Sequence, residues 1–131
     1  MSIVPLYASI LALLFVVLSI RTVQMRRRFK IVIGDAGNHA MLRAMRVHSN
    51  FAEYVPLSLL LIFFVEIRDA NVLLVHGLAW CLVIGRASHA FGVSQVKENY
   101  RFRVVGITMT FITLVVASVY LLYSYAMGSA A

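Results

Sequence analysis

The chain has 131 residues, of which 62% are hydrophobic and only 13% are charged, and its mean hydropathy is +0.89. This composition excludes an ordinary soluble domain and indicates an integral membrane protein with room for about four spanning helices and no second domain. The formal net charge of +7 does not indicate nucleic-acid binding, because the basic residues flank apolar runs, as the positive-inside rule predicts.

Four apolar runs predict the spans. Each run is long enough to cross most or all of a hydrocarbon core of about 30 Å at about 1.5 Å per residue, and the second is longer than the bilayer needs. The runs cover residues 3–20, 41–67, 72–91 and 104–125. We therefore predict an all-α, integral membrane four-helix bundle that forms one domain over residues 1–131. Residues 21–38 and 92–103 are expected to be basic loops.

The distribution of cations predicts the orientation. Seven cations lie between Arg21 and Arg46 and three between Lys97 and Arg103, whereas the remaining connection carries Arg68 alone. Both basic loops are therefore expected on the cytoplasmic side and both termini outside. The first apolar run has no basic segment before it, which predicts a retained anchor and not a cleaved signal peptide.

A polar stripe interrupts the start of the second span. Arg43, Arg46, Asn50 and Glu53 are spaced by three or four residues, so they share one face of a helix. Polar residues inside a membrane segment are costly and normally face other helices, a wet cavity or a ligand. The stripe therefore predicts either an ion pair that holds helices together or a binding site.

The predicted topology brings Arg86 and His89 of the third span, and Arg103 before the fourth, to the same depth as the stripe. Several arginines around one carboxylate favour a ligand with carboxylates or a thiolate over a structural ion pair. The four histidines are dispersed without metal-ligand spacing, and no glycine-rich phosphate loop is present. We therefore predict a site for an organic anion and no metal centre.

At these positions the chain resembles the membrane-associated proteins in eicosanoid and glutathione metabolism, the MAPEG family. The resemblance lies in Arg46, Asn50, Glu53 and Pro56 on the second span, Gly85-Arg86 with His89 on the third, and Arg103 before the fourth. It covers nearly the whole chain. The size and the segment 34–37 are most similar to the small bacterial branch that resembles microsomal glutathione transferases.

The resemblance implies a homotrimer in the bacterial inner membrane that binds glutathione between subunits. It implies that Arg46, Asn50, Glu53 and His89 hold the tripeptide, that Arg86 braces Glu53, and that Arg103 stabilises the thiolate. The implied function is a glutathione-dependent transferase or peroxidase acting on lipophilic electrophiles that partition from membrane lipid. Arg43 and Arg26 are further candidates for the glutathione site.

The chain departs from the eicosanoid-forming members. Val93 and Ile107 stand where those enzymes carry tyrosines, and Gln24 replaces an arginine of the first span, although Arg26 is near. Eicosanoid synthesis is therefore not expected. Two other functions stay open: a non-catalytic, lipid-binding scaffold of the same fold, and a small transporter that uses Glu53 as a proton carrier.

Overall fold

The computed structural model describes residues 2–95 and 99–128 and folds them into four α-helices. All four are long and apolar enough to cross a membrane. They are α1 (Val4–Phe29), α2 (His39–Ile67), α3 (Val72–Ser94) and α4 (Tyr100–Gly128). The described residues contain no strand, so the predicted all-α bundle of four spanning helices is confirmed.

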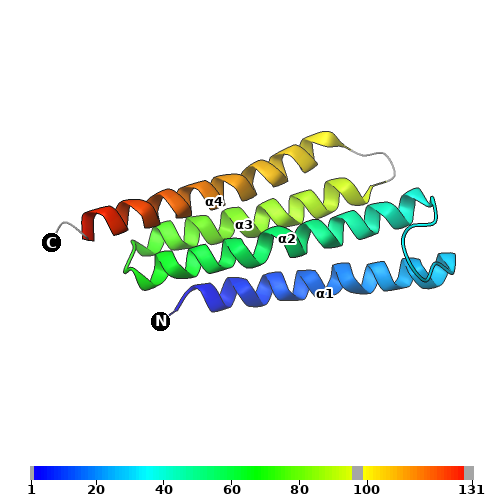
Figure 1. The fold of residues 1–131 in the computed structure, drawn as a ribbon, viewed down its shortest axis with the longest axis horizontal. Coiled ribbons are helices and arrows are strands. Elements are labelled where there is room, and N and C mark those ends of the chain that lie inside the picture. The colour runs from blue at the N-terminus through cyan, green and yellow to red at the C-terminus, as the bar shows by residue number, and fades with distance from the viewer. Residues whose placement is uncertain (1, 96–98, 129–131) are drawn as a thin grey trace.

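The helices run up and down, with both termini at one end of the bundle (Figure 1). The α1–α2 and α3–α4 connections lie together at the other end. Helix α3 packs most extensively against α4, and α1 packs mainly against α2. In the described part of the chain α1 makes no contact with α4, so the bundle is open along one side. The side of the membrane on which the termini lie stays a prediction.

Helix α1 is longer than the first apolar run, which corrects the expected loop boundary. Arg21 and the cations at 26–28 lie on its last turns instead of in a loop. Arginine, glutamine and methionine are good helix formers, and the first glycine after the apolar run is Gly34. The helix ends at Phe29, and the next residue, Lys30, caps it with a left-handed backbone conformation of φ 54°. At about 1.5 Å per residue, its 26 residues span ~39 Å and extend beyond the hydrocarbon.

Side-chain acceptors cap the starts of all four helices. At the start of α4, the side chain of Asn99 accepts from the Arg101 N–H at 3.1 Å. The side chain of Asn38 accepts from the Met41 N–H at 3.0 Å, and that of Asn71 accepts from the Leu73 N–H at 2.8 Å. The Glu66 carboxylate, at the end of α2, accepts from the backbone N–H groups of Ile3 and Val4. Glu66 therefore caps α1 and ties its start to the end of α2.

Two glycines set the close contact between α3 and α4. A Cβ atom on Gly106 would lie 2.6 Å from both the Gly85 carbonyl oxygen and the His89 backbone nitrogen. Buried Thr110, one turn further along α4, donates back to the Gly106 carbonyl at 3.0 Å, so its hydroxyl is satisfied without water. This contact fixes the offset between the two helices and with it the position of Arg103 beside α3.

Candidate functional site

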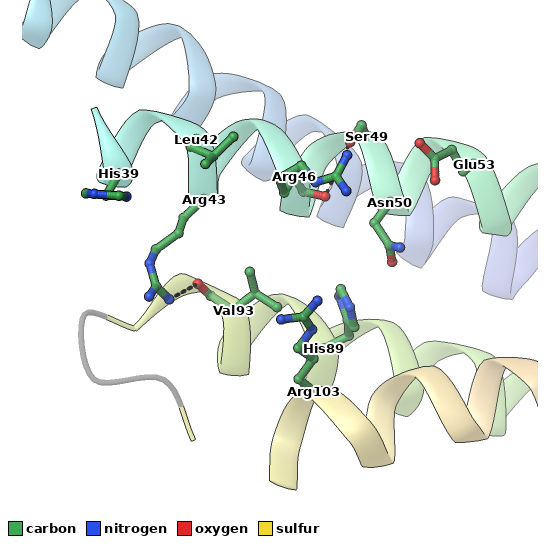
Figure 2. Close-up of a pocket in the computed structure, with 10 residues that line it drawn as sticks. All are labelled: His39, Leu42, Arg43, Arg46, Ser49, Asn50, Glu53, His89, Val93 and Arg103. Carbon is green, nitrogen blue, oxygen red and sulfur yellow. Dashed lines mark hydrogen bonds between the residues drawn. The ribbon is translucent and has the colours of Figure 1, made fainter. Parts of the chain in front are cut away.

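A polar cleft of about 340 Å³ opens between α2, α3 and α4, in the half of the bundle away from the termini (Figures 1 and 2). Its volume is at the lower end of the range of about 300–1,000 Å³ that is typical of small-molecule sites. The lining combines three arginines and two histidines with one carboxylate. The lining residues are His39, Leu42, Arg43, Arg46, Ser49, Asn50, Glu53, His89, Val93 and Arg103.

Helix α2 supplies one wall of the cleft. All four residues of the predicted stripe line it, because their spacing places them on one helical face. His39 and Ser49 also line it and were not predicted as site residues. The spacing contained a signal for both, since His39 precedes Arg43 by one turn and Ser49 follows Arg46 by one turn.

The facing wall comes from α3 and α4. His89 is buried and Val93 lies one turn further along α3. Arg103 reaches the cleft from the first turns of α4 (Figure 2). A Cβ atom on Gly92 would lie 2.9 Å from the Arg103 backbone nitrogen. The absence of a side chain at Gly92 therefore lets the backbone of Arg103 lie directly against α3.

Arg86 lies beneath the cleft and is only 1% exposed. Its Nη1 donates to Asn50 Oδ1 at 2.8 Å, and its guanidinium lies 5.8 Å from the centre of the Tyr54 ring. Its Nε and Nη2 have no hydrogen-bond partner among the described residues. Arg86 therefore fixes the Asn50 side chain and keeps two donors for a further acceptor.

The structure corrects the expected contact between Arg86 and Glu53. Glu53 is exposed and forms no ion pair within residues 2–95 and 99–128. Three residues along a helix differ by about 60° in direction. Asn50 points toward α3, whereas Glu53 remains on the outer side of α2 (Figure 2). The carboxylate is thus open to a ligand or to another chain.

Arg43 and Arg21 hold the end of α3. Arg43 Nη1 donates to the backbone carbonyl of Gln95 at 3.1 Å and approaches that of Val93 at 3.5 Å. Arg21 donates to the carbonyl of Ser94 at 3.2 Å and to its hydroxyl. The last carbonyls of a helix lack donors from within the helix and carry partial negative charge, so two guanidinium groups stabilise them. Arg43 therefore lines the cleft and also anchors one of its walls.

Two predicted site residues, Arg86 and Arg26, do not line the cleft. Arg86 still contacts Asn50 of its lining, whereas Arg26 makes its hydrogen bonds elsewhere. Its Nη1 donates to the backbone carbonyls of Val32 at 3.3 Å and Gly34 at 3.2 Å. These bonds fold the α1–α2 connection back against the last turn of α1. Within a single chain Arg26 therefore holds this connection and does not line the cleft.

A second cavity, the apolar groove, lies between α1 and α2 and has a volume of about 300 Å³. Alanines make room for it, and its lining has no charged residue. The lining residues are Ala8, Leu11, Ala12, Phe15, Phe51, Ala52, Val55, Pro56 and Leu59. Ala52 adjoins Glu53 in the chain, so the groove and the polar cleft flank the same exposed strip of α2.

The charges of the polar cleft match an anion that also carries a positive group. Arg43, Arg46 and Arg103 exceed the single carboxylate of Glu53. Guanidinium groups bind carboxylates through charge-assisted hydrogen bonds, and a carboxylate can pair with an ammonium group. The residues of the cleft therefore suit a small organic ligand that carries carboxylates and one positive group.

Four apolar helices define a multi-pass membrane protein, and a charged cleft lies between three of them. Residues 4–123 match the MAPEG family, and the chain therefore belongs to that family. It is similar to the inner membrane protein YecN of Escherichia coli strain K12, with 32% identity over 109 residues that cover 83% of this chain and 82% of the relative. YecN of Escherichia coli O6:H1 matches with the same identity and coverage. No solved structure matches the chain at a significant level.

Proposed function

We propose that this inner membrane protein is a glutathione-dependent transferase or peroxidase that acts on lipophilic electrophiles. The observation that carries the proposal is the polar cleft itself, which is lined by arginines from α2 and α4, a buried histidine from α3 and one exposed carboxylate, that of Glu53. A structural ion pair would be satisfied within the bundle, whereas Glu53 has no ionic partner in the described part of the chain. This arrangement favours a ligand over a role in packing alone.

In the proposed complex, Arg46 binds a carboxylate of glutathione and Glu53 binds the ammonium group. Asn50 and His89 hydrogen-bond the peptide groups. Arg86 orients Asn50 through the 2.8 Å bond to its side-chain oxygen. A ligand held in this way has its sulfur placed by several fixed contacts, which lowers the entropic cost of reaching the reactive geometry.

Arg103 stabilises the thiolate in this proposal. A free thiol has a pKa of about 8.5, and a guanidinium beside it favours the anion, which is the reactive nucleophile. In a transfer reaction the thiolate sulfur forms a bond to an electrophilic carbon of the acceptor, and the leaving group departs with the bonding electron pair. The proton lost from the thiol passes to water, so glutathione and the acceptor give a thioether and an acid.

The open side of the bundle supports the proposed homotrimer. Helices α1 and α4 do not touch in the described residues, and Glu53 is exposed in the isolated chain. A neighbouring copy packed against this side would bury the carboxylate and enclose the ligand. The lipophilic acceptor would then enter laterally from the bilayer, since the helices present apolar residues such as Leu13 and Leu122 outward.

The apolar groove favours a second candidate function, a lipid-binding scaffold without chemistry. Its lining is uncharged and faces the bilayer region of α1 and α2, so it could hold an acyl chain without a thiol. The two candidates differ in the polar cleft. A scaffold has no requirement for Arg103, whereas thiol chemistry depends on it.

The test compares Arg103→Ala, Arg46→Ala and the control Arg101→Ala in purified protein. Arg101 is an exposed cation two residues before Arg103 and does not line the cleft. We expect Arg103→Ala to raise the pKa of bound glutathione toward about 8.5 and to slow turnover near neutral pH by about tenfold per unit of pKa. Arg46→Ala should mainly weaken glutathione binding, because the carboxylate it contacts keeps its charge during the reaction.

The measurements are isothermal titration with glutathione, the ultraviolet absorbance of the thiolate against pH, and turnover of a chlorinated aromatic. Arg101→Ala should match the unmodified protein in all three. If Arg103→Ala leaves the thiolate titration and turnover unchanged, Arg103 is only a membrane-flanking cation and the scaffold is the better explanation.

A further inference from the structure

The α1–α2 connection presents two aliphatic side chains almost fully to the surroundings. Val32 is 88% exposed and Ile33 is 87% exposed, whereas the preceding Ile31 is buried against the bundle. The backbone that carries them is held in place, because Arg26 donates to the carbonyls of Val32 and Gly34. Both side chains are therefore exposed on a connection whose backbone is folded and hydrogen-bonded.

Cations surround this pair. Arg27 and Arg28 are exposed on the last turn of α1, and Lys30 is exposed directly after it. Asp35 is the sole acidic residue between positions 21 and 46 of the sequence. Its carboxylate accepts from the Gly37 N–H at 3.3 Å, within the same turn. The surface formed by Arg27, Arg28, Lys30, Val32 and Ile33, here called the basic-apolar surface, is therefore strongly positive.

The position of the basic-apolar surface in the bundle determines which part of the membrane surrounds it. It lies at the end of the bundle opposite the termini, where α1 ends and α2 begins (Figure 1). Because α1 spans ~39 Å and the hydrocarbon core about 30 Å, its last turn reaches the level of the lipid headgroups. Cations at that level meet lipid phosphates, and aliphatic side chains reach the acyl boundary.

We propose that the basic-apolar surface binds anionic phospholipids, with Arg27, Arg28 and Lys30 on the headgroup phosphates and Val32 and Ile33 inserted among the upper acyl carbons. Charge decides between this occupant and a second copy of the chain, because two copies would bring two sets of cations together. Free phosphate would match the cations but would leave both aliphatic side chains in water. This inference does not depend on the proposed thiol chemistry.

The experiment uses the whole protein in lipid nanodiscs. In a Cys81→Ser background, which removes the single native cysteine, an environment-sensitive fluorophore is attached at Ile33→Cys or, as a control on the same connection, at Ala36→Cys. The discs contain a phospholipid with a spin label high on its acyl chain, in either an anionic or a zwitterionic form. We expect quenching at position 33 to exceed that at position 36, and to be stronger with the anionic form.

Replacement of Arg27, Arg28 and Lys30 by glutamine should remove the preference for the anionic lipid. Each cation near an anionic surface contributes about a fivefold factor, so the preference should fall by about tenfold to a hundredfold. Arg101→Gln, in the first turn of α4, should change the preference by no more than about one such factor.

Three results would overturn the proposal. A fluorophore at position 33 that stays in water in anionic discs excludes insertion. Equal quenching by both lipids, with a signal that depends on the number of chains per disc, identifies a second copy as the occupant. Displacement of the anionic lipid by inorganic phosphate identifies a site for the free ion.

Discussion

At Gly106, α4 lies so close to α3 that a methyl group does not fit. A Cβ atom there would be 2.6 Å from the Gly85 oxygen, 2.6 Å from the His89 nitrogen and 2.7 Å from the His89 Cβ. All three belong to backbone or to the base of a side chain, so no flexible group can move aside. We predict that Gly106→Ala forces the two helices apart.

The magnitude follows from these distances. Carbon makes favourable non-bonded contacts at about 3.5–4.0 Å, so α4 must retreat by roughly 1 Å. Overpacking of this kind costs about 1–3 kcal/mol of stability. Arg103 lies one turn from Gly106 and moves with the helix, and a displacement of about 1 Å at a reacting group can cost about a hundredfold in rate.

Thermal unfolding in detergent measures the stability, and thiol-dependent turnover measures the position of Arg103. The matched control is Gly77→Ala, because Gly77 lies on α3 with no atom within 4 Å of a new Cβ. That change should be neutral or stabilising by about 0.5–1 kcal/mol, as alanine is the better helix former. If Gly106→Ala is as stable as Gly77→Ala, α3 and α4 do not lie as close together at Gly106 as described.

Further predictions concern the polar residues and the orientation. Asn50→Ala should lower stability by about 1.5–3 kcal/mol in thermal unfolding, because buried Arg86 loses the side-chain oxygen that accepts its hydrogen bond. Asn50→Asp should retain this bond and the stability. If the two variants are equally stable, the bond is incidental. Glu53→Gln should change the free energy of unfolding of the single chain by less than about 1 kcal/mol, since the carboxylate is exposed. The same variant should bind glutathione more weakly in titration. Unchanged affinity would remove Glu53 from the site. A cysteine at Arg27, in a Cys81→Ser background, should react with an impermeant reagent only from the cytoplasmic side, while tags at both termini react from outside. Labelling at Arg27 from outside would reverse the predicted orientation. A cysteine at Lys97, in the second loop predicted on the cytoplasmic side, should be labelled in the same way; Lys97 lies outside the described residues.

The apolar runs and the polar stripe could be read from the sequence because both depend on local properties. Transfer of apolar residues into lipid is nearly additive along the chain, so runs of about 20 residues identify the four spans. The helical period places Arg46, Asn50 and Glu53 on one face whatever surrounds them. The depth of His89 and Arg103 followed from the up-and-down topology, and the structure brings all five residues to one cleft.

The partner of each arginine was decided only by the tertiary structure. The chain places several guanidinium groups at similar depth, and their spacing in sequence does not distinguish a ligand site from a backbone carbonyl. The rotation of α2 about its axis turns Asn50 and not Glu53 toward α3 (Figure 2). Arg86 on α3 therefore donates to Asn50. Arg26 donates hydrogen bonds to the backbone of the α1–α2 connection, and Arg43 donates to the backbone at the end of α3. Such choices depend on how each helix is rotated and shifted against its neighbours, by a few ångströms, which no local sequence pattern contains.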